Sequence, residues 1–127
     1  MSQQFDANTR PFVADAAIVQ FARVVFESDS RVVTAGLTEV GIGIAQTAAF
    51  AAGDVIAVKL WNSTGTFKMR ASEALAAAAT LYTESDGEVQ DTAQATSVPF
   101  AQALEAATAD GDIIECVLLP YRGTAAE

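Results

Sequence analysis

The chain has 127 residues, 51% of them apolar, with 16 acidic and 7 basic side chains and a formal net charge of −9. A chain of this length forms one domain and buries enough apolar surface to fold without a metal ion or a disulfide. The excess of carboxylates argues against binding to nucleic acid or to an anionic membrane, since both need clustered Lys and Arg, and it favours a partner with a basic surface.

Residues 1–15 differ from the rest of the chain, because Phe5, Pro11 and Phe12 are apolar side chains in a polar, irregular setting. We expect an N-terminal arm here, which either frays or docks on a partner. The start has neither the basic nor the apolar region of a signal peptide, so none is expected. Residues 16–122 are expected to form a single β domain, followed by a loose tail over 123–127.

The first half of the domain contains four β-rich segments. Residues 21–26 are followed by a turn at 28–30 and an extended stretch at 32–34. Small Gly and Ala residues alternate with Ile over 40–46, which suits a strand packed closely on its neighbour. Gly53 and Asp54 then turn the chain into a strand over 55–61.

The second half opens with a turn at 62–65 and a short strand over 66–69. The alanine-rich residues 72–79 predict one short helix, with Ser72 as its N-cap. Further strands are expected at 81–83, 97–105 and 113–119. Asp86 and Gly87 between β-prone segments indicate a hairpin, because both residues tolerate positive φ.

Two blocks of the sequence recur in the same order. Residues 45–56 match 103–114 at an offset of 58, and residues 27–32 match 84–89 at an offset of 57. Two copies, about 21–60 and 78–119, are too few for a repeat array. The sequence therefore predicts a mainly β fold, a small β-barrel or β-tulip-like domain built from a duplicated unit.

The residues indicate no catalytic, metal or cofactor site, and we expect no enzyme. Without histidine the chain lacks the usual zinc ligand and the base of a Ser-His or Cys-His pair. Carboxylates at Asp86, Asp110 and Asp112 are of the type used in glycoside hydrolysis or calcium binding. Asp beside Gly is, however, ordinary turn chemistry. The single cysteine, Cys116, lies in an apolar segment that predicts a buried thiol.

Trp61 and Tyr121 each follow the last strand of a copy. We interpret them as core caps or interface residues, although a lone Trp can also serve as a platform for a sugar ring. A small carbohydrate-binding module therefore stays open as an alternative function.

Several segments resemble the small capsid decoration (cement) proteins of tailed bacteriophages. They are the alanine-rich residues 74–83, the hairpin at 86–89, and residues 103–107 and 110–114. The resemblance covers about residues 18–119. It departs from the family pattern at Ala78 and Ala101, where the family often has glycine.

The resemblance implies a β-barrel or β-tulip domain that lies as homotrimers on the outer capsid surface of the virion. Such proteins are made in the host cytoplasm, bind the major capsid protein and hold the lattice against the pressure of packaged DNA, with many weak contacts acting together. Because N-terminal arms in the family often reach the capsid, Phe5, Arg10, Pro11 and Phe12 are the candidate capsid contacts. Another β-structured virion component, such as a tail or fibre module, is the second alternative.

Overall fold

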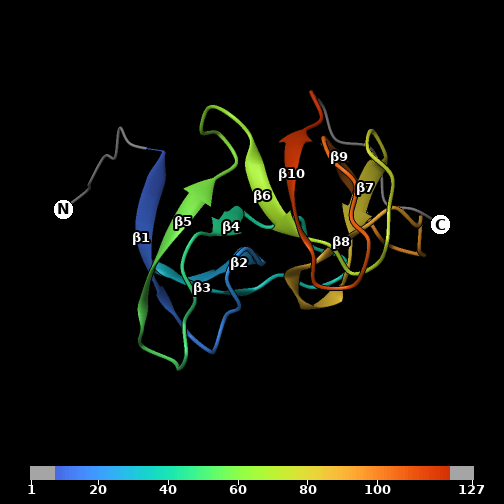
Figure 1. The fold of residues 1–127 in the computed structure, drawn as a ribbon. Helices are drawn as coiled ribbons and strands as arrows, with labels where there is room; N and C mark the ends of the chain where they lie inside the picture. The colour runs from blue at the N-terminus through green and yellow to red at the C-terminus, as the bar shows by residue number, and fades with distance from the viewer. Residues whose placement is uncertain (1–7, 121–127) are drawn as a thin grey trace.

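Residues 8–120 are the part of the chain that this computed structural model describes. They form two five-stranded halves that lie side by side (Figure 1). The first half contains β1 (Thr9–Ala14), β2 (Arg23–Ser28), β3 (Arg31–Thr34), β4 (Gly43–Ala45) and β5 (Val55–Leu60). The second half contains β6 (Phe67–Arg70), β7 (Thr80–Thr83), η1 (Ser85–Gly87), β8 (Val89–Gln90), β9 (Pro99–Ala103) and β10 (Ile113–Leu118). The prediction of a mainly β, barrel-type fold is confirmed.

The first half is a closed barrel with the strand order β1-β3-β2-β4-β5. β1 closes it by pairing antiparallel with β5 and parallel with β3. Successive side chains of a strand point to opposite faces, and β5 follows that rule, with Ile56 and Val58 buried and Val55 exposed. The buried residues of the five strands fill the barrel, including Val24 and Val32 at 0% exposure.

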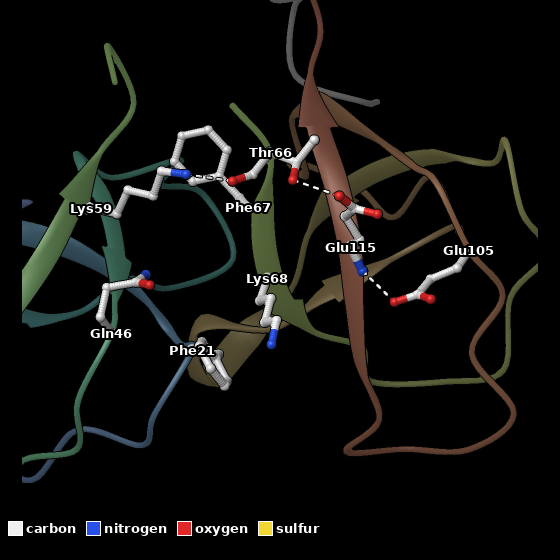
Figure 2. A pocket seen from close by; sticks show the side chains of 8 residues that line it. All are labelled: Phe21, Gln46, Lys59, Thr66, Phe67, Lys68, Glu105 and Glu115. Atoms are coloured by element: carbon white, nitrogen blue, oxygen red, sulfur yellow. Dashed lines mark hydrogen bonds between the residues drawn. The ribbon is translucent and has the colours of Figure 1, made fainter. Parts of the chain in front are cut away.

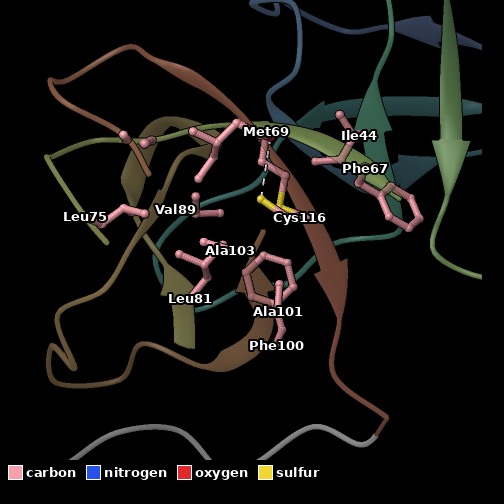
Figure 3. Packing of buried hydrophobic residues seen from close by; sticks show 13 residues of the cluster. Ile44, Phe67, Met69, Leu75, Leu81, Val89, Phe100, Ala101, Ala103 and Cys116 are labelled. Carbon is pink, nitrogen blue, oxygen red and sulfur yellow. Dashed lines mark hydrogen bonds between the residues drawn. The ribbon is translucent and has the colours of Figure 1, made fainter. Parts of the chain in front are cut away.

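The second half repeats this topology as a sheet with the order β6-β10-β9-β7-β8. A lone parallel bridge between Ala71 and Val89 joins its two ends. Its core is centred on Met69, Phe100 and Cys116, and Ile44 from the first half packs into it (Figure 3). The thiol of Cys116 is buried as predicted, and burial, with smaller effects from Glu105 and Glu115, raises its pKa to about 12.

Backbone hydrogen bonds show the duplication directly, because many recur one copy later. In each of the following pairs the bond in the first half has the same donor and acceptor positions as the bond in the second half. They are Ala14 N to Asp54 O (2.8 Å) and Ala71 N to Asp112 O (2.8 Å), Ile18 N to Ala49 O (2.9 Å) and Leu75 N to Ala107 O (3.0 Å), and Phe21 N to Ala45 O (2.7 Å) and Ala78 N to Ala103 O (2.9 Å).

The predicted helix over 72–79 is wrong. Leu75 forms an antiparallel bridge with Ala107, and Ala78 has φ of 71°, which no right-handed helix contains. A helix of eight residues is marginal in isolation. Pairing with the neighbouring loop of the same half therefore determines the conformation, as it does in the equivalent segment around Ile18.

The expectation of an arm over residues 1–15 also differs from the structure. Thr9–Ala14 form β1, which pairs with β5 at five positions from Thr9–Lys59 to Val13–Val55. Its counterpart is β6, since Phe12 lies opposite Ile56 as Met69 lies opposite Ile114. Each copy thus begins one strand earlier than the sequence match between the two copies indicates. Residues 1–7 and 121–127 lie outside the described part of the chain.

Arg23 joins the two halves. Its side chain is fully buried and donates to main-chain carbonyls from both halves. The acceptors are Gly36 O (3.3 Å) and Glu39 O in the first half, and Glu88 O (3.1 Å) and Glu84 O in the second. Burial lowers the pKa of Arg23 to about 10, against the opposing attraction of Glu39 and Glu84, so the guanidinium is charged at neutral pH.

Gly87 completes this joint, because it has φ of 71° and no room for a side chain. A Cβ atom at Gly87 would lie 2.9 Å from the Cβ of Ala22 and 3.0 Å from the backbone nitrogen of Arg23. Its own N–H donates to Ala35 O at 2.9 Å. The predicted Asp86-Gly87 turn is therefore also the point where the second half packs on the first.

Candidate functional site

Of the carboxylates singled out in the sequence, Asp112 stabilises its own turn. The Oδ2 atom of Asp112 accepts hydrogen bonds from Thr108 N (2.8 Å) and Ala109 N (3.2 Å). These bonds lower the pKa of Asp112, with the Thr108 amide as the largest cause. Asp54 accepts from Phe50 and Ala51 in the same way in the first half. A carboxylate that ties down its own loop is not positioned for proton transfer.

Two other groups of acidic residues come together in the second half. Burial raises the pKa of Glu88, and Asp110 and Asp86 raise it further. Glu73 and Asp91 share a hydrogen bond that lowers the pKa of Glu73 and raises that of Asp91. Within residues 8–120, no three His, Cys, Asp or Glu side chains are arranged to hold a metal ion.

An open groove of about 570 Å³ lies between the two halves (Figure 2). Both lysines of the chain, Lys59 and Lys68, line it together with Glu105 and Glu115. Four of the lining residues are linked by hydrogen bonds: Lys59 donates to Thr66 O, Thr66 Oγ1 donates to Glu115 Oε2 (2.6 Å), and Glu115 N donates to Glu105 Oε1 (2.8 Å). These bonds connect β5, the residue before β6, and β10 across the groove.

Trp61 is partly buried and packs against the core of the second half. Its ring packs edge-on against Phe67, with centroids 5.1 Å apart, and against Phe100 at 5.7 Å. The indole nitrogen donates to Gly41 O at 2.8 Å. The interpretation of Trp61 as a core cap fits these contacts better than a sugar platform. Tyr121 lies outside the described residues.

The candidate capsid contacts separate into different environments. Phe12 is 6% exposed and belongs to the barrel core, so its side chain does not face a partner, because the alternation of β1 turns it inward. The guanidinium of Arg10 lies 4.5 Å from the centre of the Phe12 ring, and Pro11 is exposed. Arg10 and Pro11 are thus on the surface of β1, while Phe5 lies outside the described residues.

Sequence reasoning missed a set of exposed apolar side chains in the first half. Phe50 is 87% exposed, Val55 68%, and Val19 and Phe26 54% each. A signal was present, since the repeat aligns Phe50 with the polar residue Thr108. A large apolar side chain in a position that the other copy fills with a polar one is not required by the fold.

A comparison with protein families matches residues 11–119 to the model described as phage cement protein. The chain belongs to the phage cement protein family. This is a family of structural phage proteins, and the resemblance stated from the sequence is therefore confirmed. No curated protein sequence matches the chain. No helix in the described part of this cement-family protein is long and apolar enough to cross a membrane.

Among solved structures, this cement-family protein is similar to the N base of the head fiber protein gp8.5 of bacteriophage phi29. The TM-score is 0.73 at 16% sequence identity, and the match covers 94% of this chain and 97% of the other. At that identity the similarity shows a shared fold.

Proposed function

We propose that this protein binds the outer surface of a phage head and stabilises the capsid lattice as a homotrimer. The family match over residues 11–119 is the observation that carries the proposal. The similarity of its fold to the base of a phage head fiber supports a place on the head. The partner is the major capsid protein, and the site of action is the outer face of the virion.

The mechanism is adhesion by a rigid body. The two five-stranded halves, joined by Arg23, present a fixed surface, so little conformational entropy is lost when that surface is buried. A trimer that engages three subunits at once gains affinity, because its second and third contacts form intramolecularly. Binding to the assembled lattice alone stabilises that lattice by mass action.

Three of the four candidate capsid contacts near the N-terminus are kept in this proposal. Arg10 and Pro11 lie at the surface of β1, in the same half as the exposed apolar residues, and remain candidates together with Phe5. Phe12 is withdrawn because its ring fills the barrel.

Co-sedimentation with undecorated heads of the phage that encodes the protein tests the proposal. The bound amount should saturate at a copy number fixed by the shell symmetry, and sedimentation of the free protein should report a trimer. Purified tails and free DNA serve as controls. Binding to tails, with heads left bare, would favour a tail module. If the protein saturates the heads as a monomer, the proposed trimer is wrong, while binding to the head stands.

A further inference from the structure

An apolar patch marks one end of the first half. The loops 15–22 and 46–54 lie together there, below the strands in Figure 1, joined by the Ile18–Ala49 bridge. Ala17, Val19, Ala48 and Phe50 line a shallow depression of about 450 Å³, with Arg70 at its edge. We call this surface the Phe50 patch. Exposure of these apolar side chains to water is unfavourable, at about 25 cal/mol for each Å² of apolar area.

The second copy provides an internal control for this patch. Phe50 N and Thr108 N both donate to the Oδ2 atom of the aspartate four residues later, at 2.9 and 2.8 Å. The loop backbone is thus the same with an aromatic side chain or with a small polar one. Val19 likewise corresponds to Ala76. The fold does not need these two large side chains, so their role lies outside the fold.

The two halves carry very different charges. Residues 8–61 hold five acidic and four basic side chains, a net charge of −1. Residues 62–120 hold nine acidic and two basic side chains, a net charge of −7. A protein partner that buries the first half has few carboxylates to remove from water. The acidic second half is suited to stay in solvent.

Arg70 gives the patch a positive edge. Among the described residues its guanidinium donates to the carbonyls of Gln20 (3.3 Å) and Gly111 (3.4 Å), and both bonds are long. Its Nε atom is buried and has no hydrogen-bond partner among the described residues. The one ion pair found within residues 8–120 joins Arg31 and Asp15. No carboxylate of these residues contacts Arg70 directly, although its charge attracts that of Glu88 and acts to lower the pKa of that side chain.

We propose that the Phe50 patch is the head-facing surface of this protein, and that it takes an apolar segment of the shell protein whose carboxylate pairs with Arg70. This inference rests on the proposed function and adds to it the orientation of the molecule and the chemistry of its partner. Phe50 and Val19 bury against the apolar side chains of that segment. The acidic second half then lies to the side of this contact (Figure 1).

Head binding by matched variants tests the inference. Phe50→Thr with Val19→Ala installs the second copy's residues, and we expect at least a tenfold weaker affinity for heads. Arg70→Gln should weaken binding at least fivefold. Thr108→Ala, in the equivalent loop, is the control and should bind like wild type. Urea unfolding should show unchanged midpoints for the double variant, because both its side chains are exposed.

The outcomes separate the inference from the function it rests on. If wild type saturates the heads and the double variant binds equally well, the orientation proposed here is wrong while decoration stands. If wild type does not bind, both fall together. If the double variant instead loses self-association in the absence of heads, a second copy covers the patch, and the proposed partner is wrong.

Discussion

Replacing Arg23 with methionine tests how the two halves are held together. Methionine replaces the aliphatic stem of arginine but not its guanidinium, so it provides no donor for the four carbonyls that Arg23 contacts. A carbonyl left without a donor costs about 1–3 kcal/mol where water cannot replace it. Relief of the guanidinium from burial offsets several kcal/mol. The net loss we expect is about 2–4 kcal/mol, out of a total of about 5–15 kcal/mol for such a domain.

Urea unfolding followed by Trp61 fluorescence measures this loss, because Trp61 packs on the second-half core next to the joint. With a slope of about 2 kcal/mol per molar urea, the midpoint should fall by about 1–2 M. Arg31→Met is the control: its ion pair with Asp15 is exposed and should contribute less than about 1 kcal/mol. If Arg23→Met and Arg31→Met shift the midpoint equally, Arg23 does not lock the halves.

Three further changes follow from the same structure. Phe12→Ala should destabilise the barrel by about 3–5 kcal/mol in thermal unfolding, whereas Pro11→Ala should leave it within about 0.5 kcal/mol, and equal effects would contradict the inward orientation of Phe12. Ala78→Gly should stabilise the protein by about 0.5–1 kcal/mol, because a left-handed alanine costs about 1–2 kcal/mol and glycine loses part of that gain in the unfolded chain; a lower melting temperature would refute this. Because the folded-state pKa of Glu88 is raised, ionised Glu88 destabilises the fold, and stability falls as pH rises through that pKa. Glu88→Gln should therefore raise the urea midpoint at pH 7, and the difference from wild type should vanish below about pH 4, where Glu88 is protonated in both states; a gain that persists at low pH would contradict the burial of its charge.

The duplication was predictable because its turns need particular residues. Gly53 and Gly111 have φ of 96° and 92° at equivalent positions. Because this backbone conformation favours glycine, the Gly-Asp sequence recurs in both copies. The equivalence of strands β1 and β6 is not visible in the sequence, since a strand requires only alternation of buried and exposed side chains. Phe12 and Met69, for example, fill equivalent core positions with different residue types.

The prediction of a helix was wrong, and the contacts of Arg23 between the halves were not predicted, because both features depend on residues distant in the sequence. Alanine favours a helix locally, but the segment around Leu75 is fixed by Ala107 on another loop. Arginine is usually exposed, and nothing near Arg23 in the sequence indicates its carbonyl partners up to 65 residues away. The position equivalent to Arg23 in the second copy is Thr80, which is exposed.

The candidate capsid contacts were predicted from the family resemblance, and they stay proposals. Phe12 on β1 is the exception, because its side chain belongs to the barrel core. Phe50 was missed because it lies in a block of sequence that recurs in both copies and was interpreted only as a turn of the fold. Comparing the two copies position by position, with Thr108 as the reference, is what separates the two roles.

Electron cryo-microscopy of heads saturated with the purified protein tests decoration most directly. We predict added density outside the shell at symmetry-related sites, shaped as two adjoining five-stranded halves, with the end that carries Phe50 against the shell. Heads that show no added density after incubation with excess protein would contradict the central claim.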